Sequence, residues 1–86
     1  MFKVYLLKSQ KDNKYYIGQT QDIDKRLEMH NSGCVKSTKS RIPFILIGFE
    51  EFKTRDESRY REYELKTKPH KKKKFIEKLE YENIEK

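Results

Sequence analysis

Residues 2–18 read FKVYLLKSQKDNKYYIG, in which a polar segment separates two apolar runs. The runs at 2–7 and 14–18 contain aromatic and β-branched side chains, which favour β-strands. The polar residues 9–13 between them are of the types that form turns. This stretch therefore predicts an antiparallel β-hairpin at the start of the chain.

The register of this hairpin determines which side chains share a face of the sheet. If the turn is centred between Gln10 and Lys11, Tyr5 lies directly opposite Tyr16, and directly opposed residues share a face. A shift of one residue would send the two tyrosines to opposite faces. The sequence thus predicts a pair of tyrosine side chains on one face.

A helix is predicted from Asp22 to about His30. The Asp22 side chain can accept a hydrogen bond from a first-turn amide, which typically stabilises a helix by about 1 kcal/mol. Asn31-Ser32-Gly33 should end the helix, because Asn and Gly tolerate the left-handed conformation. Arg26 and His30, four residues apart, are expected to share a face of this helix.

The middle of the chain predicts one more strand and a second helix. Residues 43–49 are almost continuously apolar, so we expect them to form the buried strand of the sheet. Thr54 and Glu57 have the spacing of a capping box. They are expected to open a helix that ends at about Lys66.

A final helix is predicted from Pro69, which suits the first turn of a helix. Its apolar stripe consists of Phe75, Ile76 and Leu79. Residues 81–86 are expected to form a frayed tail.

The predicted fold class is α/β (α+β), with a three-stranded antiparallel sheet flanked by helices in the order β-β-α-β-α-α. A length of 86 residues is typical of one domain. We expect that domain to cover residues 1–86, with a core at about 2–80.

The charge of the chain favours an anionic partner. The formal net charge is +7, and 41% of the residues are charged. Such a field attracts polyanions, with nucleic acid the first expectation and an anionic membrane surface the second. A lysine-rich soluble surface explains the composition alone equally well. We expect no membrane partner. No stretch approaches the ~20 apolar residues of a membrane span, and no amphipathic basic helix with Trp or a long apolar face indicates binding to a membrane surface.

The single cysteine, Cys34, excludes an internal disulfide and a thiolate zinc site. The apolar run at the start of the chain is too short for a signal peptide. The sequence therefore predicts a cytoplasmic protein, and it contains no pattern that indicates a small-molecule cofactor.

Basic side chains gather in two segments. They are Lys36, Lys39 and Arg41 ahead of the third strand, and Lys71, Lys72, Lys73 and Lys74 on the final helix. We interpret both segments as contacts to nucleic-acid phosphates, which add affinity without reading sequence. The alternative for the lysine run is a solvated helix face. No aromatic side chains alternate with these lysines, so they do not indicate a single-strand stacking groove.

Two tyrosines on adjacent strands, followed by an arginine and a histidine on a helix, form an unusual polar group. In this order the chain resembles the GIY-YIG nuclease family. Tyr16-Ile17-Gly18 matches the second motif letter for letter, whereas Lys3-Val4-Tyr5 retains only the tyrosine of the first. The resemblance continues through Ser37-Thr38 to Arg61-Glu62 and covers roughly residues 2–80. The opening Val4-Tyr5-Leu6-Leu7 is similar to that of many small stand-alone bacterial members, which resemble the nuclease domain of an excision-repair protein.

The resemblance implies a role for each matching polar residue. Tyr5 and Tyr16 would flank the attacking water, one of them acting as or supporting the general base. Arg26 would hold the scissile phosphate, for which a planar guanidinium is well suited. His30 would assist proton transfer or bind phosphate, and Glu62 would be the metal's only protein ligand.

The remaining motif residues, Ile17 and Gly18, would be structural, and Gly18 would make room beside the site. A glycine within a strand usually marks a bulge or a close approach. Without the resemblance, Glu57, Glu64 and Glu77 would be as plausible as metal ligands as Glu62.

The resemblance also implies a reaction, the metal-dependent hydrolysis of a phosphodiester of DNA by an endonuclease of repair or recombination. Mg²⁺ (or Mn²⁺) suits a single carboxylate, because Mg²⁺ keeps several waters and takes its other ligands from the phosphate. The alternative is a non-catalytic nucleic-acid-binding protein on the same scaffold. The residues leave open which tyrosine takes the proton.

Overall fold

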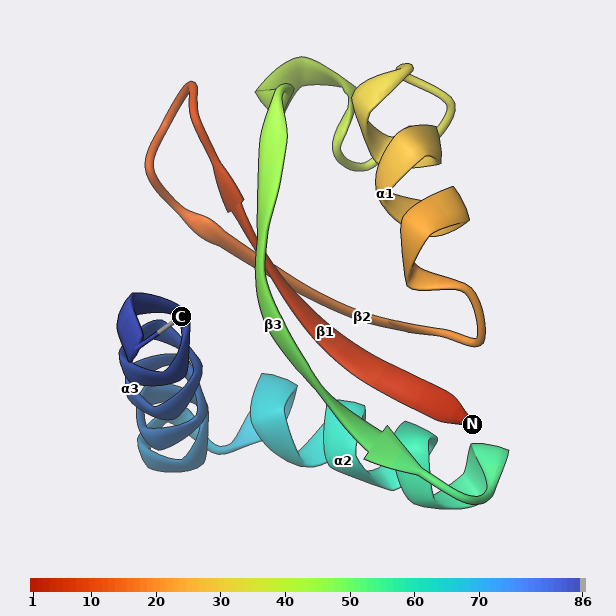
Figure 1. Cartoon of the computed structure of the whole chain (residues 1–86), viewed down its shortest axis with the longest axis vertical. Helices are drawn as coiled ribbons and strands as arrows, with labels where there is room; N and C mark the ends of the chain where they lie inside the picture. The colour runs from red at the N-terminus through yellow and green to blue at the C-terminus, as the bar shows by residue number, and fades with distance from the viewer. Residues whose placement is uncertain (86) are drawn as a thin grey trace.

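The computed structural model describes residues 1–85. Strands and helices follow one another in the predicted order, with a short 3-10 helix before the third strand (Figure 1). The elements are β1 (Phe2–Ser9), β2 (Tyr15–Thr20), α1 (Ile23–Asn31), η1 (Lys39–Arg41), β3 (Phe44–Phe52), α2 (Arg55–Thr67) and α3 (Pro69–Glu85). No helix in this part of the chain is long and apolar enough to cross a membrane.

The central strand of the sheet is β1, which is antiparallel to β2 on one side and to β3 on the other. Alternate residues of a strand point to opposite faces. On one face, Val4 and Leu6 pack with side chains of α2 and α3. On the other face, Tyr5 and Leu7 pack with side chains of α1. The predicted sheet flanked by helices is thus confirmed.

The expectation that residues 43–49 form the buried strand is wrong. Four consecutive residues of β1, Val4 to Leu7, are fully buried, because this strand has a neighbour on each side. β3 is an edge strand, and Ile45 and Phe49 remain exposed on it. A continuous apolar run therefore does not reveal which strand of this sheet is central.

The hairpin register differs from the predicted one by two residues. Tyr5 pairs with Gly18, and Tyr16 pairs with Leu7. The difference arises in the loop, where the amide of Ser9 donates to the carbonyl of Lys14 at 2.9 Å and four residues form the tip. A shift of two preserves the face, so Tyr5 and Tyr16 still lie on the same side, with ring centroids 6.4 Å apart.

The predicted helix starts are confirmed by their caps. The Asp22 side chain accepts from the amide of Lys25, and Gly33 has a φ of +83° just after α1 ends. Thr54 and Glu57 form the reciprocal capping box at the start of α2. These caps fix where α1 and α2 begin, and so which of their side chains face the sheet.

The final helix is longer than the sequence predicts. Phe75 and Leu79 are buried and Ile76 packs against them, as expected. However, α3 continues to Glu85, so a frayed tail from residue 81 is wrong up to that point, and residue 86 lies outside the described residues. No glycine or proline follows Pro69, so nothing in the sequence stops the helix.

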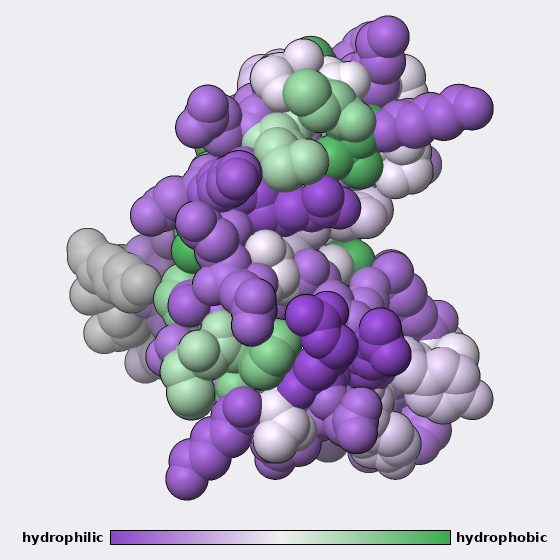
Figure 2. Space-filling view, turned by 90° about the vertical axis from the view of Figure 1, so that its right-hand side faces the viewer, coloured by the Kyte–Doolittle hydropathy of each residue, from purple (hydrophilic) through white to green (hydrophobic). Residues whose placement is uncertain are grey.

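The side of the molecule that carries α1 and the N-terminus is mostly hydrophilic (Figure 2). Hydrophobic side chains form only small separate groups there. This distribution agrees with the large share of charged residues in the chain.

Candidate active site

The hydroxyl of Tyr5 is the centre of a polar cluster between the sheet and α1. It lies 2.9 Å from Nε2 of His30, and Nε of Arg26 donates to it at 3.4 Å. The spacing of Arg26 and His30 on one helix face brings both side chains to the same oxygen. The structure thus brings together three of the residues that the resemblance selects.

Gly18 is the reason why Tyr5 can take this position. A Cβ added at Gly18 would lie 2.6 Å from Cζ of Tyr5, and closer still to its hydroxyl. Any other residue here would displace the ring. Ile17 points to the opposite face, where it is buried with the side chains of α2 and α3. Both motif residues therefore contribute to packing on β2.

His30 is fully buried, and both of its ring nitrogens have partners. The Thr38 hydroxyl donates to the carbonyl of Val35 at 3.3 Å, so its oxygen accepts from Nδ1 of His30 at 2.8 Å. That assignment leaves Nε2 as an acceptor for the Tyr5 hydroxyl. No nitrogen of His30 is free for a phosphate, so proton transfer through Tyr5 fits this geometry and direct phosphate contact does not.

The electrostatics of the cluster agree with this hydrogen-bond pattern. Burial, together with the positive charge of Arg26, lowers the pKa of His30 to about 4, so the ring is neutral at pH 7. Burial raises the pKa of Tyr5 above its ordinary value, although the hydrogen bond from Arg26 opposes that change. Neutral Tyr5 therefore donates to neutral His30.

Tyr16 is the more accessible of the two tyrosines. Tyr5 has only 1% of its surface exposed, whereas Tyr16 is half-buried. The Tyr16 ring packs edge-on against His30, with centroids 5.1 Å apart. The ammonium of Lys66 lies 5.9 Å from the centroid of the Tyr16 ring, which links this ring to α2.

Glu62 reaches the cluster from α2. Its Oε1 accepts from Nε2 of Gln19 at 3.0 Å, and its Oε2 lies 2.7 Å from Nζ of Lys66. The negative charge of Glu62 contributes to the raised pKa of Tyr5, so the two groups interact. The buried hydroxyl of Ser58 holds Gln19 in turn, donating to Oε1 of Gln19 at 2.8 Å.

The other candidate carboxylates are engaged elsewhere. Glu57 caps the first turn of α2, and Glu64 pairs with Arg61 and Lys71, each at 2.7 Å. These two cations lower the pKa of the Glu64 carboxyl. Glu77 is exposed on α3 and lines a depression that contains none of the tyrosines. Of the four glutamates, Glu62 is the one whose charge acts on Tyr5 and whose partner Lys66 lies over the Tyr16 ring.

A divalent metal fits Glu62 by its chemistry. Among the side chains that the structure describes, residues 1–84, no three His, Cys, Asp or Glu come together as a metal site. A single hard carboxylate suits Mg²⁺, which takes its remaining oxygens from water and phosphate. The Lys66 ammonium shows that a cation can bind at Oε2 of Glu62. The Lys66 side chain is half exposed, so it can move away when a metal binds.

The predicted phosphate-binding residues do not form one surface. Lys36 and Lys39 are exposed after α1, whereas Arg41 pairs with Asp12 at 2.7 Å. The run of four lysines winds around α3: Lys71 pairs with Glu64, while Lys72 and Lys73 lie beside Ile76 on another side. Any phosphate contacts from this run would come from two sides of α3.

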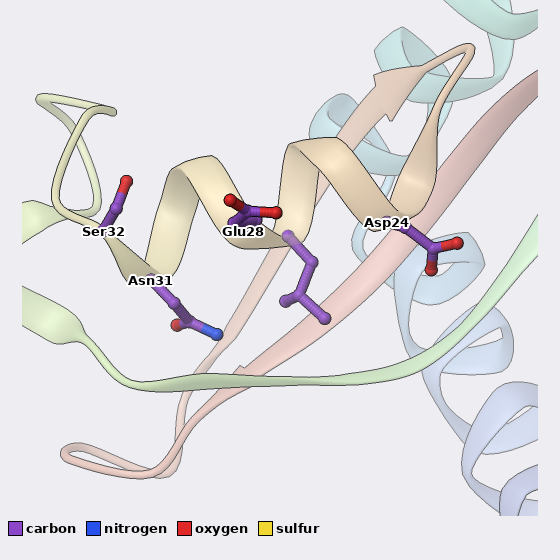
Figure 3. A pocket seen from close by; sticks show the side chains of 5 residues that line it. Asp24, Glu28, Asn31 and Ser32 are labelled. Atoms are coloured by element: carbon purple, nitrogen blue, oxygen red, sulfur yellow. The ribbon is translucent and has the colours of Figure 1, made fainter.

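An open pocket lies along α1, outside this cluster (Figure 3). It is lined by Asp24, Leu27, Glu28, Asn31 and Ser32. Asn31 extends toward β3, where its amide exchanges hydrogen bonds with the backbone of Phe44. Two carboxylates make this pocket unsuitable for a phosphate.

Two members of the cluster, Thr38 and Gln19, were not among the predicted site residues. Thr38 fixes the tautomer of His30, and Gln19 orients Glu62. Thr38 belongs to the segment Ser37-Thr38, which is the one signal in the sequence that could have selected it. No comparable signal marks Gln19, since its partner is 43 residues away.

The three-stranded sheet and its buried cluster of tyrosine, arginine and histidine define a class of small α/β domains. A family model described as the GIY-YIG catalytic domain matches residues 1–76. The chain belongs to the GIY-YIG family.

Its relatives include small bacterial proteins. UPF0213 protein CPE1444 of Clostridium perfringens is 44% identical over 64 residues, which are 73% of this chain and 68% of the relative. UPF0213 protein BH0048 of Halalkalibacterium halodurans is 38% identical over 96% of this chain and 92% of its own length. The solution NMR structure of BH0048 superposes with a TM-score of 0.58 at 36% identity, covering 98% of this chain and 94% of that one.

Proposed function

We propose that this protein is a metal-dependent endonuclease that hydrolyses a phosphodiester of DNA. The observation that carries the proposal is the Tyr5 hydroxyl held between Arg26 and His30, with Glu62 close enough to affect its pKa. Buried polar groups that shift one another's pKa values are typical of catalytic sites. A role in DNA repair or recombination rests on the family resemblance.

Arg26 is the proposed phosphate-binding residue. Its Nε contacts Tyr5, which leaves the other N–H groups of the guanidinium for phosphate oxygens. A fixed positive charge beside the reacting phosphate stabilises the negative charge that develops during hydrolysis. The Tyr5 contact holds the guanidinium in place before the substrate arrives.

The two tyrosines would have different roles toward the attacking water. The Tyr5 hydroxyl donates its proton toward His30, so its lone pairs face away from the histidine. Tyr16, which is more accessible, would contact the water directly. His30 is a positioning residue in this scheme, because it acts on the water only through Tyr5.

Glu62 would hold the metal, Mg²⁺ or Mn²⁺. The ion would supply positive charge to the phosphate and to a bound water. Gln19 and Ser58 keep the Glu62 carboxylate at the edge of the tyrosine face, and Lys66 neutralises it until a metal replaces the ammonium.

Cleavage assays on labelled DNA test this proposal directly. The purified protein should cut linear or branched DNA with added Mg²⁺ or Mn²⁺ and stop in a chelator. Glu62→Gln should abolish cutting while it preserves the fold, and Glu77→Gln, an exposed glutamate on α3, is the matched control. Equal activity of the two variants would place the metal ligand elsewhere.

The second candidate is a nucleic-acid-binding protein without catalysis. The observation in its favour is the ion pair of Glu62 with Lys66, which already neutralises the carboxylate. Salt-dependent binding of DNA, with every DNA in the panel intact after long incubation with metal, would favour this candidate.

A further inference from the structure

Two large aromatic side chains lie exposed on α2. Tyr60 and Tyr63 have 61% and 62% of their surfaces accessible. They are three residues apart, and side chains at this spacing are neighbours on a helix surface. The opposite side of α2 is buried through Ser58 and Leu65, so the two tyrosines are not part of the core.

The aromatic pair lies on the same helix as Glu62 of the candidate active site. Lys66 lies one turn after Tyr63, and its ammonium binds Glu62. Arg59, one turn before Tyr63, is also exposed. Basic side chains therefore flank the aromatic pair of α2, whereas no aromatic side chain stands within the lysine run of α3.

Two exposed rings with a cation on each side, Arg59 before them and Lys66 after them, have a specific chemical preference. Nucleobases stack on aromatic side chains, and nearby cations bind the phosphates of the same strand. Bases in a duplex are already stacked on one another, so a surface of this kind selects unpaired nucleotides. A protein partner would more often require an apolar surface, whereas here charged residues surround the rings.

We infer that Tyr60 and Tyr63, with Arg59 and Lys66, form a binding site for unpaired bases of the DNA strand next to the cleaved bond. The location next to the cut rests on the proposed function, because it depends on Glu62 being the metal ligand. The stacking contact itself does not require cleavage. The preferred substrate class is DNA with a single-stranded segment.

A tryptophan probe tests the contact. The chain contains no tryptophan, so Tyr63→Trp introduces a single indole, which can be excited apart from the tyrosines and which a stacked base quenches. The control is Tyr81→Trp on α3, where the native side chain is also 62% exposed. With oligothymidylate in a chelator, Tyr63→Trp should be quenched and Tyr81→Trp should not. An abasic strand of the same length should leave both unchanged.

Affinity measurements give a second, independent readout. Tyr63→Ala should weaken binding of oligothymidylate by about fivefold or more, and Tyr63→Phe should retain the native affinity. Binding of a blunt duplex should change little in either variant. Equal quenching at positions 63 and 81, quenching by the abasic strand, or an unchanged affinity of Tyr63→Ala would overturn the inference. If the native protein binds oligothymidylate as expected but cuts no DNA, that result counts against the proposed endonuclease and not against the stacking site.

Discussion

The ammonium of Lys66 lies 2.7 Å from Oε2 of Glu62, on the carboxylate that is proposed to hold the metal. A lysine and a divalent ion cannot occupy the same side of one oxygen at once. A metal at Glu62 would therefore compete with Lys66 for the negative charge of this carboxylate.

The first prediction concerns this competition. Lys66→Met keeps the length of the side chain but removes the charge, so Mn²⁺ should bind up to about fivefold more tightly, the range expected for a partly exposed ion pair. Titration calorimetry, or the relaxation enhancement of water by bound Mn²⁺, measures the change. Lys72→Met, an exposed lysine on α3, should leave the affinity unchanged. Weaker Mn²⁺ binding in Lys66→Met would contradict the competition.

The second prediction concerns the close approach of Gly18 and Tyr5. A methyl group at Gly18 would overlap the Tyr5 ring, so Gly18→Ala should destabilise the fold by about 1–3 kcal/mol and displace the hydroxyl from His30. Urea denaturation measures the free energy of unfolding. Gly48→Ala is the comparison, because its methyl group would meet Leu79 at 3.1 Å, a milder overlap. A smaller loss for Gly18→Ala than for Gly48→Ala would refute this account.

Local sequence signals predicted most of this fold, because they act over a few residues. The caps at Asp22 and Thr54 and the spacing of Arg26 and His30 depend on neighbours within one helical turn. The hairpin register was wrong by two residues because it depends on the loop, in which Asn13 has a positive φ of 60°. The central strand was predicted wrongly, because its position depends on which strands pair, and strand pairing joins segments that are far apart in the sequence.

The candidate site, like the fold, could be predicted from the sequence only in part. The motif residues could be selected from the order of Tyr5, Tyr16, Arg26 and His30 along the chain, although their roles remain proposals. The supporting hydrogen bonds could not be predicted, because they join distant segments. Gln19 meets Glu62 across 43 residues, and polar side chains of this kind are common on any surface.

The third prediction concerns the pH dependence of stability. The folded-state pKa of His30 is about 4, below its ordinary value of 6.5. Between these values the unfolded chain binds a proton that the folded chain does not, so stability is full above about pH 6.5 and falls as the pH drops toward 4. The loss is of order 3 kcal/mol. Asp12, with a pKa lowered to about 2 by Arg41, contributes only at lower pH.

Thermal denaturation between pH 7 and pH 4.5 measures this slope. His30→Gln should flatten the curve, whatever its effect on stability at pH 7. His70→Gln should keep the native slope, since His70 is exposed on α3. An unchanged slope in His30→Gln would mean that His30 is not the buried neutral group.

The last prediction separates stabilisation of the transition state by Arg26 from its contribution to ground-state DNA binding. Arg26→Lys keeps one positive charge but loses the planar fork and its contact to Tyr5, so kcat should fall by roughly 10²–10³. Affinity for DNA, measured in a chelator, should fall far less, because the charge and the basic surface remain. Arg55→Lys, an exposed arginine in the first turn of α2, is the matched control and should cut at the native rate. If Arg26→Lys loses affinity and kcat in equal measure, the guanidinium binds the DNA phosphate but does not specifically stabilise the transition state. If it keeps full activity, the phosphate must be bound by another cation, and the Tyr5 contact to Arg26 is a packing feature of the fold.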